Sequence, residues 1–281
     1  MSEPATYPPD PHVTRDLAPI VERDESGSTI LLPVTPALLD DWGRLRAGPV
    51  ATVVDIVCGE TAIREVLPQW IATSTLSLQL AELPTQGTLR AQPRVLRKGR
   101  TTLVQEVALD HVETGGPLGL GTVAFSILPG KNPLQSRAVW AEEPEPRSTF
   151  ANATSGFEKP LLEQLGLRFD EEDPAVARLD VRDYVINTLG AMQGGVVAML
   201  IDATGERFAR HALGGPVRVR GLEIHYLKLA RHGPVRATAR LLGEIGAAEG
   251  GGLIVRVELH DEGGADVLLT LATLIVDRAP H

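Results

Sequence analysis

Two long apolar segments dominate the pattern of hydrophobic and polar positions along the chain. They cover residues 50–65 and 196–212, and glycine stands just before each. In both, apolar residues occupy nearly the whole helical circumference and not one stripe, which is typical of a helix surrounded by protein. Segments of alternating apolar and polar residues follow each of them, as in half-buried strands. The pattern therefore predicts two central helices with strands wrapped around them.

The two helical segments belong to an internal repeat. Residues 87–96 align with residues 233–242 at an offset of 146, and residues 47–55 align with 194–202 at an offset of 147. Each repeat has the same predicted order: a short strand (residues 29–34 or 177–181), the long helix, and then several alternating strands. We interpret the chain as a tandem duplication.

The duplication predicts the domain organisation. The 281 residues are enough for two domains that each bury a core. We expect the first repeat at residues 29–130 and the second at 160–281. Residues 131–159, rich in Pro, Glu, Asn and Ser, are expected to form a surface linker, and residues 1–28 a loosely held N-terminal tail.

Composition and charge exclude several classes of function. The net charge of −9 provides no general positive field for a nucleic acid or an anionic membrane. The longest charge-free apolar stretch, residues 267–276, is ten residues long, about half of the ~20 that a membrane-spanning helix needs. Residues 1–16 lack the basic start and apolar middle of a signal peptide. We therefore expect a cytoplasmic protein with neither a nucleic-acid partner nor a membrane partner.

Cysteine and histidine usage adds little chemistry. The single cysteine, Cys58, has no partner for an internal disulfide and lies inside the first apolar helix, so we interpret it as a core residue. The seven histidines show no metal-ligand spacing, and no metal or cofactor is expected.

One aspartate lies deep inside each apolar helix, Asp55 in the first and Asp202 in the second. Burying a carboxylate is unfavourable unless it is paired, hydrogen-bonded or used in chemistry. The structural alternative is a carboxylate bonded to nearby backbone or to a basic side chain. In the second repeat, Asn187 precedes Gln193-Gly194-Gly195, and Asp202 follows six residues after Gly195.

These spacings resemble the hotdog-fold thioesterases of the phenylacetate-pathway and 4-hydroxybenzoyl-CoA type, whose motif is Asn, five residues, His-Gly-Gly, six residues, Asp. The resemblance covers both repeats, roughly residues 29–130 and 160–278. It implies an α+β double hotdog, in which each repeat wraps an antiparallel sheet around a central helix. Gln193 departs from the motif: it stands at the usual histidine position and can hydrogen bond but not titrate.

Helix geometry indicates a site shared between the repeats. Asp202 follows Gly194 by eight residues, which is about 12 Å along one helix at ~1.5 Å per residue, too far for both to contact one reacting carbon. The resemblance likewise implies that each active site combines the glycine end of one helix with the carboxylate of the other.

Two composite sites are then possible, and the sequence does not treat them alike. The first combines Asn187, Gln193 and Gly194 with Asp55, and Thr73 stands where the family often has a Ser or Thr that holds the attacking water. We expect this composite to be the working one.

The second composite has lost its supporting groups. It would combine Asp202 with Asp40, Arg46 and Ala47, which stand where the first composite has Asn187, Gln193 and Gly194. Val219 or Arg220 stands at the position of the Thr73 hydroxyl. We expect that it has decayed or binds without turnover.

The resemblance implies a role for each residue of the first composite. The N–H of Gly194 polarises the thioester carbonyl at the positive end of a helix, and Gly195 contributes to substrate binding. Asp55 acts either as general base on a water or as a nucleophile that forms an acyl anhydride. Asn187, Gln193 and Thr73 orient the reactants. Plainer interpretations are a turn residue for Asn187 and a β-branched strand residue for Thr73.

A basic segment in the first repeat is a candidate for coenzyme A binding. Arg97, Lys98 and Arg100 fall at the predicted tip of a strand-turn-strand, where they could meet phosphates. The alternative is a solvated hairpin. The matching stretch of the second repeat, residues 243–250, carries no positive charge.

The sequence thus favours an acyl-CoA thioesterase, with an acyl-CoA as its partner. A non-catalytic acyl-CoA-binding or regulatory protein is the main alternative. An enoyl-CoA hydratase is less favoured, because residues 47–70 and 194–210 contain no histidine. The aromatic content of 4% favours an aliphatic acyl tunnel. A homodimer of double-hotdog chains is possible.

Overall fold

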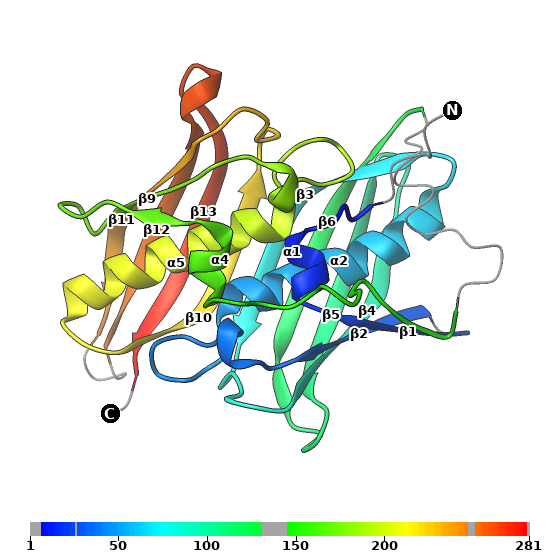
Figure 1. Ribbon diagram of the computed structural model, residues 1–281, viewed down its shortest axis with the longest axis horizontal. Coiled ribbons are helices and arrows are strands. Elements are labelled where there is room, and N and C mark those ends of the chain that lie inside the picture. Colours follow the sequence, from blue (N-terminus) through cyan, green and yellow to red (C-terminus); the bar gives the residue numbers. More distant parts are fainter. Residues whose placement is uncertain (1–6, 26, 131–144, 247–250, 280–281) are drawn as a thin grey trace.

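The computed structural model describes residues 7–25, 27–130, 145–246 and 251–279. Two 20-residue helices, α2 (Ala47–Val66) and α5 (Gly194–Leu213), lie against one face of a large antiparallel sheet (Figure 1). Both begin and end within a few residues of the positions predicted from the apolar pattern. α2 is buried over most of its circumference, as that pattern required.

The first half of the sheet contains β2 (Gly27–Pro33), β3 (Trp70–Leu80), β4 (Thr88–Lys98), β5 (Thr102–His111) and β6 (Pro117–Leu128). The second half contains β9 (Val176–Leu179), β10 (Val217–Tyr226), β11 (Val235–Ile245), β12 (Gly252–Asp261) and β13 (Val267–Arg278). Three short strands complete the edges: β1 (Ile20–Asp24), β7 (Arg147–Thr149) and β8 (Arg168–Phe169). In the described residues the strand order is β7-β1-β2-β4-β5-β6-β3-β10-β13-β12-β11-β9-β8, with antiparallel neighbours throughout.

The duplication predicted from the sequence extends to fine details of the backbone. A 3₁₀ turn precedes each long helix, at Pro36–Leu38 and at Asp183–Val185. The first long strand after each helix has a register shift at the corresponding position, between Thr73 and Thr75 in β3 and between Val219 and Gly221 in β10. The chain is a double hotdog: two copies of an antiparallel sheet wrapped around a central helix.

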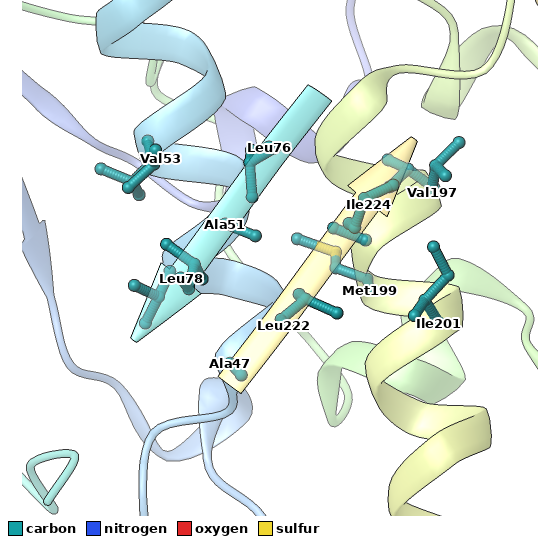
Figure 2. Packing of buried hydrophobic residues seen from close by; sticks show 14 of the residues in the cluster. Ala47, Ala51, Val53, Leu76, Leu78, Val197, Met199, Ile201, Leu222 and Ile224 are labelled. Carbon is teal, nitrogen blue, oxygen red and sulfur yellow. The ribbon is translucent and has the colours of Figure 1, made fainter. Parts of the chain in front are cut away.

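The two halves join in the middle of the sheet, where β3 pairs with β10. Leu76 lies opposite Ile224 and Leu78 opposite Leu222, and all four side chains are buried. Figure 2 shows these residues between α2 and α5. Because the sheet runs continuously through this junction, each half contributes to one shared core.

Glycines let the two helices approach each other closely. A Cβ added to Gly48 would lie 2.7 Å from Cα of Met199, and one added to Gly195 would lie 2.7 Å from Cα of Thr52. Real side chains do not tolerate such distances, so these positions require glycine. The N-terminal halves of α2 and α5 are therefore packed against each other.

The N-terminal region differs from the loosely held tail expected at residues 1–28. In its described part, helix α1 (Val13–Asp16) buries Val13, and Leu17 and Val21 are also buried. β1 pairs with both β2 and β7, and β7 belongs to the expected linker, whose residues 131–144 lie outside the described part. The four-residue spacing of Val13, Leu17 and Val21 was the local signal for this burial.

The remaining short elements are helix α4 (Leu161–Leu165) and a 3₁₀ turn at Glu262–Gly264. Within the described residues, each helix is too short or too polar to cross a membrane. Cys58 is fully buried in α2, as predicted for a core residue.

Candidate active site

The start of each long helix faces the aspartate of the other helix. The Gly48 N–H at the start of α2 donates a hydrogen bond of 3.0 Å to Oδ2 of Asp202. At the start of α5, a Cβ on Gly194 would lie 2.8 Å from Oδ2 of Asp55. The structure thus contains two composite sites, each drawing on both helices, as helix geometry had indicated.

The composite site around Asp55 is open. It forms a cavity of about 390 Å³, and its polar wall includes Asp55, Thr73, Asn187, Gln193 and Gly194. The rest of the wall is largely apolar and comes from both repeats: Ile56, Ile63, Ile71, Phe125, Leu128, Phe150, Met192, Val197, Leu227, Leu229, Leu259 and Leu269. An apolar cavity with a few convergent polar groups is the usual form of a small-molecule site.

Asp55 lies one and a half turns beyond the N-terminal turn of α2 and is held by a strand residue. The Thr73 hydroxyl in β3 donates a hydrogen bond of 2.8 Å to Oδ1 of Asp55. Burial raises the pKa of Asp55 to about 6, and the Thr73 hydrogen bond opposes that rise. A carboxyl with this pKa is mostly ionised at neutral pH and is basic enough to accept a proton from water.

Gly194 is the first residue of α5, so its N–H lies at the positive end of a 20-residue helix. Among the described residues its N–H has no hydrogen-bond acceptor. The Tyr226 hydroxyl donates a hydrogen bond of 2.9 Å to the Gly194 carbonyl, in the next peptide of the helix start. The arrangement leaves a donor available to an incoming oxygen atom beside Asp55.

Asn187 has the turn role considered as its plainer interpretation. Its Oδ1 accepts hydrogen bonds from the N–H groups of Leu189 (2.8 Å) and Ala191 (3.2 Å). This closes the loop that leads into α5, while Asn187 also lines the cavity. Any action on a substrate stays a prediction.

Gln193 and Gly195 complete the residues predicted for the start of α5. Gln193 is 6% exposed, and its Oε1 accepts a hydrogen bond of 3.4 Å from the Thr14 hydroxyl. Gly195 packs against Thr52 of α2 and does not line the cavity in the described residues, so its geometry shows only a packing role.

The composite site around Asp202 is closed. Its cavity is only about 30 Å³, room for a single water. Arg46, whose side chain is 9% exposed, forms an ion pair of 2.5 Å with Glu206 across the space between the helices. Asp40 is engaged by Arg44 at 3.2 Å and by two backbone N–H groups, so it has the same turn role as Asn187.

The charged groups of the closed site affect one another's pKa values. Burial raises the pKa of Asp202 to about 6 and that of Glu206 to about 7, while the positive charge of Arg46 opposes both shifts. At positions corresponding to Arg46 and Glu206, the open site has Gln193 and Gly59. At these two positions the open site therefore lacks the ion pair that occupies the closed one.

The predicted basic tip lies at the turn between β4 and β5. Arg97, Lys98 and Arg100 are absent from the described lining of the open cavity, and the Lys98 ammonium contacts the carbonyl and carboxylate of Glu65. Lys228, just after β10, lines the cavity instead. Coenzyme A binding at the basic tip stays a prediction.

The cavity residues that sequence reasoning missed include Tyr7, Tyr226 and Lys228. Tyr226 could have been found, because it continues the inward alternation of Leu222 and Ile224. Tyr7 and Lys228 have no local signal, since only the folded chain brings them to the cavity. In the described residues, no cluster of three or more histidine, cysteine or acidic side chains could hold a metal ion.

Several solved structures share this fold at low sequence identity. A putative thioesterase from Novosphingobium aromaticivorans matches with a TM-score of 0.62 at 15% identity, covering 92% of this chain and 98% of that one. The tesB protein of Mycobacterium avium subsp. paratuberculosis matches with a TM-score of 0.62 at 13% identity, covering 92% and 96%. A putative oleoyl thioesterase from Lactobacillus plantarum has a TM-score of 0.61 at 11% identity, covering 95% and 100%.

No protein-family model matches the chain, and no curated protein sequence matches it either. At these identities, the structural matches establish the double hotdog fold alone.

Proposed function

We propose that the chain is an acyl-CoA thioesterase that hydrolyses its substrate to a free acid and coenzyme A at the open composite site. One observation carries the proposal: the Asp55 carboxylate lies close to Gly194, whose N–H has no acceptor among the described residues, and both residues line a largely apolar cavity. Enzymatic hydrolysis of an acyl thioester needs three features: a base or nucleophile, a hydrogen-bond donor to the oxyanion, and space for the acyl chain. The thioesterases among the structural neighbours share this fold and support the proposal.

In the proposed mechanism the thioester carbonyl oxygen accepts a hydrogen bond from Gly194. Ionised Asp55 then takes a proton from a water, whose oxygen attacks the carbonyl carbon, and the developing oxyanion is stabilised at the helix start. Collapse of the tetrahedral intermediate breaks the carbon–sulfur bond. The coenzyme A thiolate leaves and takes up a proton, and the free acid is released.

A nucleophilic route uses the same groups in a different order. Asp55 attacks the carbonyl carbon, coenzyme A thiolate leaves, and water hydrolyses the resulting acyl anhydride. The two routes differ in the fate of the water oxygen. After a single turnover in H₂¹⁸O, the nucleophilic route places label in the Asp55 carboxylate when water attacks the Asp55 carbonyl carbon, whereas the general-base route places it only in the released acid.

The cavity favours an aliphatic acyl group, since most of the apolar side chains in its wall are branched aliphatic and one more is the methionine Met192. Lys228 on the wall and the basic tip of the β4–β5 hairpin are the two candidate sources of positive charge for coenzyme A phosphates. Comparing acyl-CoA with acyl-pantetheine measures how much the nucleotide part contributes to substrate binding. If Lys228 or the basic tip binds phosphate, acyl-CoA has the lower KM.

The test is thiol release from acyl-CoAs of increasing chain length, with a protein-only blank for the thiol of Cys58. Hydrolysis that depends on chain length supports the proposal. Absence of hydrolysis with every acyl-CoA contradicts it.

A non-catalytic acyl-CoA-binding protein is the second candidate, favoured by Gln193, which cannot titrate as the histidine of related motifs does. This candidate predicts no thiol release but a higher Tm in saturating acyl-CoA.

A further inference from the structure

The segment from Tyr7 to Leu17 lies outside both repeats but is firmly attached to the second one. The ring of His12 accepts a hydrogen bond of 3.1 Å from Thr14 N at Nδ1, so Nε2 donates to the carbonyl of Ile186 at 2.8 Å. The Tyr184 hydroxyl donates a hydrogen bond of 2.6 Å to Asp16. Ile186 and Tyr184 belong to the turn before α5, so the segment is tied to the loop that shapes the open site.

Arg15 fixes the backbone that directly follows Tyr7. Its guanidinium donates hydrogen bonds to the carbonyl of Pro9 (2.7 Å), to that of Pro8, and to that of Phe150 (2.9 Å). Phe150 itself lines the open cavity. Three carbonyls held by one planar donor leave little freedom for the position of Tyr7.

Tyr7 forms part of the wall of the cavity that contains Asp55 and Gly194. Its ring packs edge-on against that of His12, with centroids 5.4 Å apart and planes at 68°. The Thr14 hydroxyl of the same segment donates a hydrogen bond of 3.4 Å to Oε1 of Gln193. The N-terminal segment therefore contacts the residue that replaces the motif histidine.

The Tyr7 hydroxyl keeps its proton at neutral pH. Burial, and secondarily the negative charge of Asp55, raise its pKa well above the usual value, and the Thr14 hydroxyl opposes this shift. A neutral phenol is a hydrogen-bond donor. The wall of the cavity that contains Asp55 thus includes a neutral phenol as a donor, besides the Gly194 N–H.

We propose that Tyr7 is a catalytic residue supplied from outside both repeats, whose hydroxyl donates a hydrogen bond to the carbonyl oxygen of the bound thioester. The inference rests on the proposed function, because it assigns a role within the same site. It also gives a reason for the extensive anchoring of residues 7–17: a donor must be held in place to stabilise an oxyanion.

Two matched substitutions test the role, Tyr7→Phe and Tyr184→Phe. Each removes one phenolic hydroxyl from the anchored N-terminal assembly, but only Tyr7 lines the cavity. Tyr7→Phe is expected to lower kcat about 10²-fold with little change in KM, in line with the loss of one oxyanion donor. Tyr184→Phe removes an anchor of the segment but no group from the cavity wall, so it is expected to lower Tm and to lower kcat far less than Tyr7→Phe does.

A spectroscopic measurement tests the same contact without turnover. An acyl-CoA labelled with ¹³C at the thioester carbonyl is bound to the Asp55→Asn protein, and its carbonyl stretch is recorded by isotope-edited infrared spectroscopy. Hydrogen bonding lowers that frequency. We expect the Asp55→Asn/Tyr7→Phe protein to lose part of the downshift and the Asp55→Asn/Tyr184→Phe protein to keep it.

The outcomes separate this inference from the proposed function. If Tyr7→Phe retains activity within about twofold, or if the carbonyl frequency is the same with and without the Tyr7 hydroxyl, Tyr7 has only a packing role. If the wild-type protein binds acyl-CoA but does not hydrolyse it, the thioesterase proposal fails, and a Tyr7-dependent downshift still shows the carbonyl contact. If no acyl-CoA binds, both proposals fail.

Discussion

The two composite sites are built from the same elements, yet one is an open cavity and the other is filled. Each has an aspartate at the same turn of its helix, a helix start facing it, and a turn residue whose side-chain oxygen closes the preceding loop. The open site is about 390 Å³ and the closed one about 30 Å³. The two repeats therefore share the backbone of the site but differ in the side chains that line it.

Two pairs of positions account for most of this difference. Gln193 in the open site corresponds to Arg46 in the closed one, and Gly59 corresponds to Glu206. Arg46 and Glu206 form an ion pair in the closed site. At the corresponding positions of the open site, Gln193 has a shorter, neutral side chain and Gly59 has none. A buried salt bridge thus occupies one composite site of this chain while the fold around it matches that of the open one.

The largest expected effect separates the two aspartates. Asp55→Asn is expected to lower kcat about 10³-fold or more, because it removes the general base or nucleophile. Asp202→Asn is expected to stay within about threefold of wild type, because its site has no room for a substrate. Steady-state thiol release measures both. If Asp202→Asn is the inactive protein, the working site has been assigned to the wrong half.

A matched pair at the helix starts is expected to give the next largest effect. In Gly194→Ala the new Cβ would lie 2.8 Å from the Asp55 carboxylate, so the base must move. A displacement of this kind costs about 10²-fold in kcat. The reverse change at the corresponding position, Ala47→Gly, is expected to leave kcat unchanged and to cost about 1 kcal/mol of stability for a glycine in a helix.

Equal losses of activity in Gly194→Ala and Ala47→Gly would contradict the functional asymmetry of the two sites. Circular dichroism and Tm measurements control for misfolding of either variant.

The ion pair of the closed site is expected to show strong energetic coupling. Arg46→Gln leaves Glu206 and Asp202 buried without their cation, which is expected to cost about 3 kcal/mol at pH 8. Arg46→Gln/Glu206→Ala removes one of those carboxylates and is expected to be more stable than the single variant. Urea denaturation measures both. If the stability losses of the single variants Arg46→Gln and Glu206→Ala add up to the loss in the double variant, the pair contributes no coupling.

The pH dependence of that loss has a definite sign. The pKa values of Asp202 and Glu206 are raised to about 6 and about 7 in the wild type, and without Arg46 they rise further, so in the variant both groups become neutral at a higher pH than in the wild type. The destabilisation by Arg46→Gln should therefore be smaller at pH 6 than at pH 8.

The smallest expected effect concerns the tuning of Asp55 by Thr73. Both routes need ionised Asp55, so activity should rise with pH through an apparent pKa near 6 and then level off. Thr73→Val removes the hydrogen bond that favours the ionised form, so the acid limb should move to higher pH. The loss should be several-fold at pH 6.5 and smaller at pH 8.5, measured as kcat/KM across pH. Val219→Ala, on the corresponding strand of the closed site, should leave the profile unchanged.

Sequence periodicity alone determined the main architecture. The full-circumference apolar segments predicted α2 and α5 within a few residues, and the repeat offset predicted two equivalent halves. The rise per residue in a helix ruled out a site made of Gly194 and Asp202, so it also indicated a composite site. These features are local or repetitive, and so they can be derived from spacing.

Only the tertiary structure decided how the sites are filled. The sequence contains Arg46 and Glu206, but their ion pair spans 160 residues and depends on the close approach of two helices at glycine. Tyr7 likewise lines the cavity of Asp55 only because Arg15, His12 and Asp16 anchor its segment to distant carbonyls and a hydroxyl. Spacing along a chain determines which residues share a helix face, whereas contacts between distant segments depend on how those faces pack.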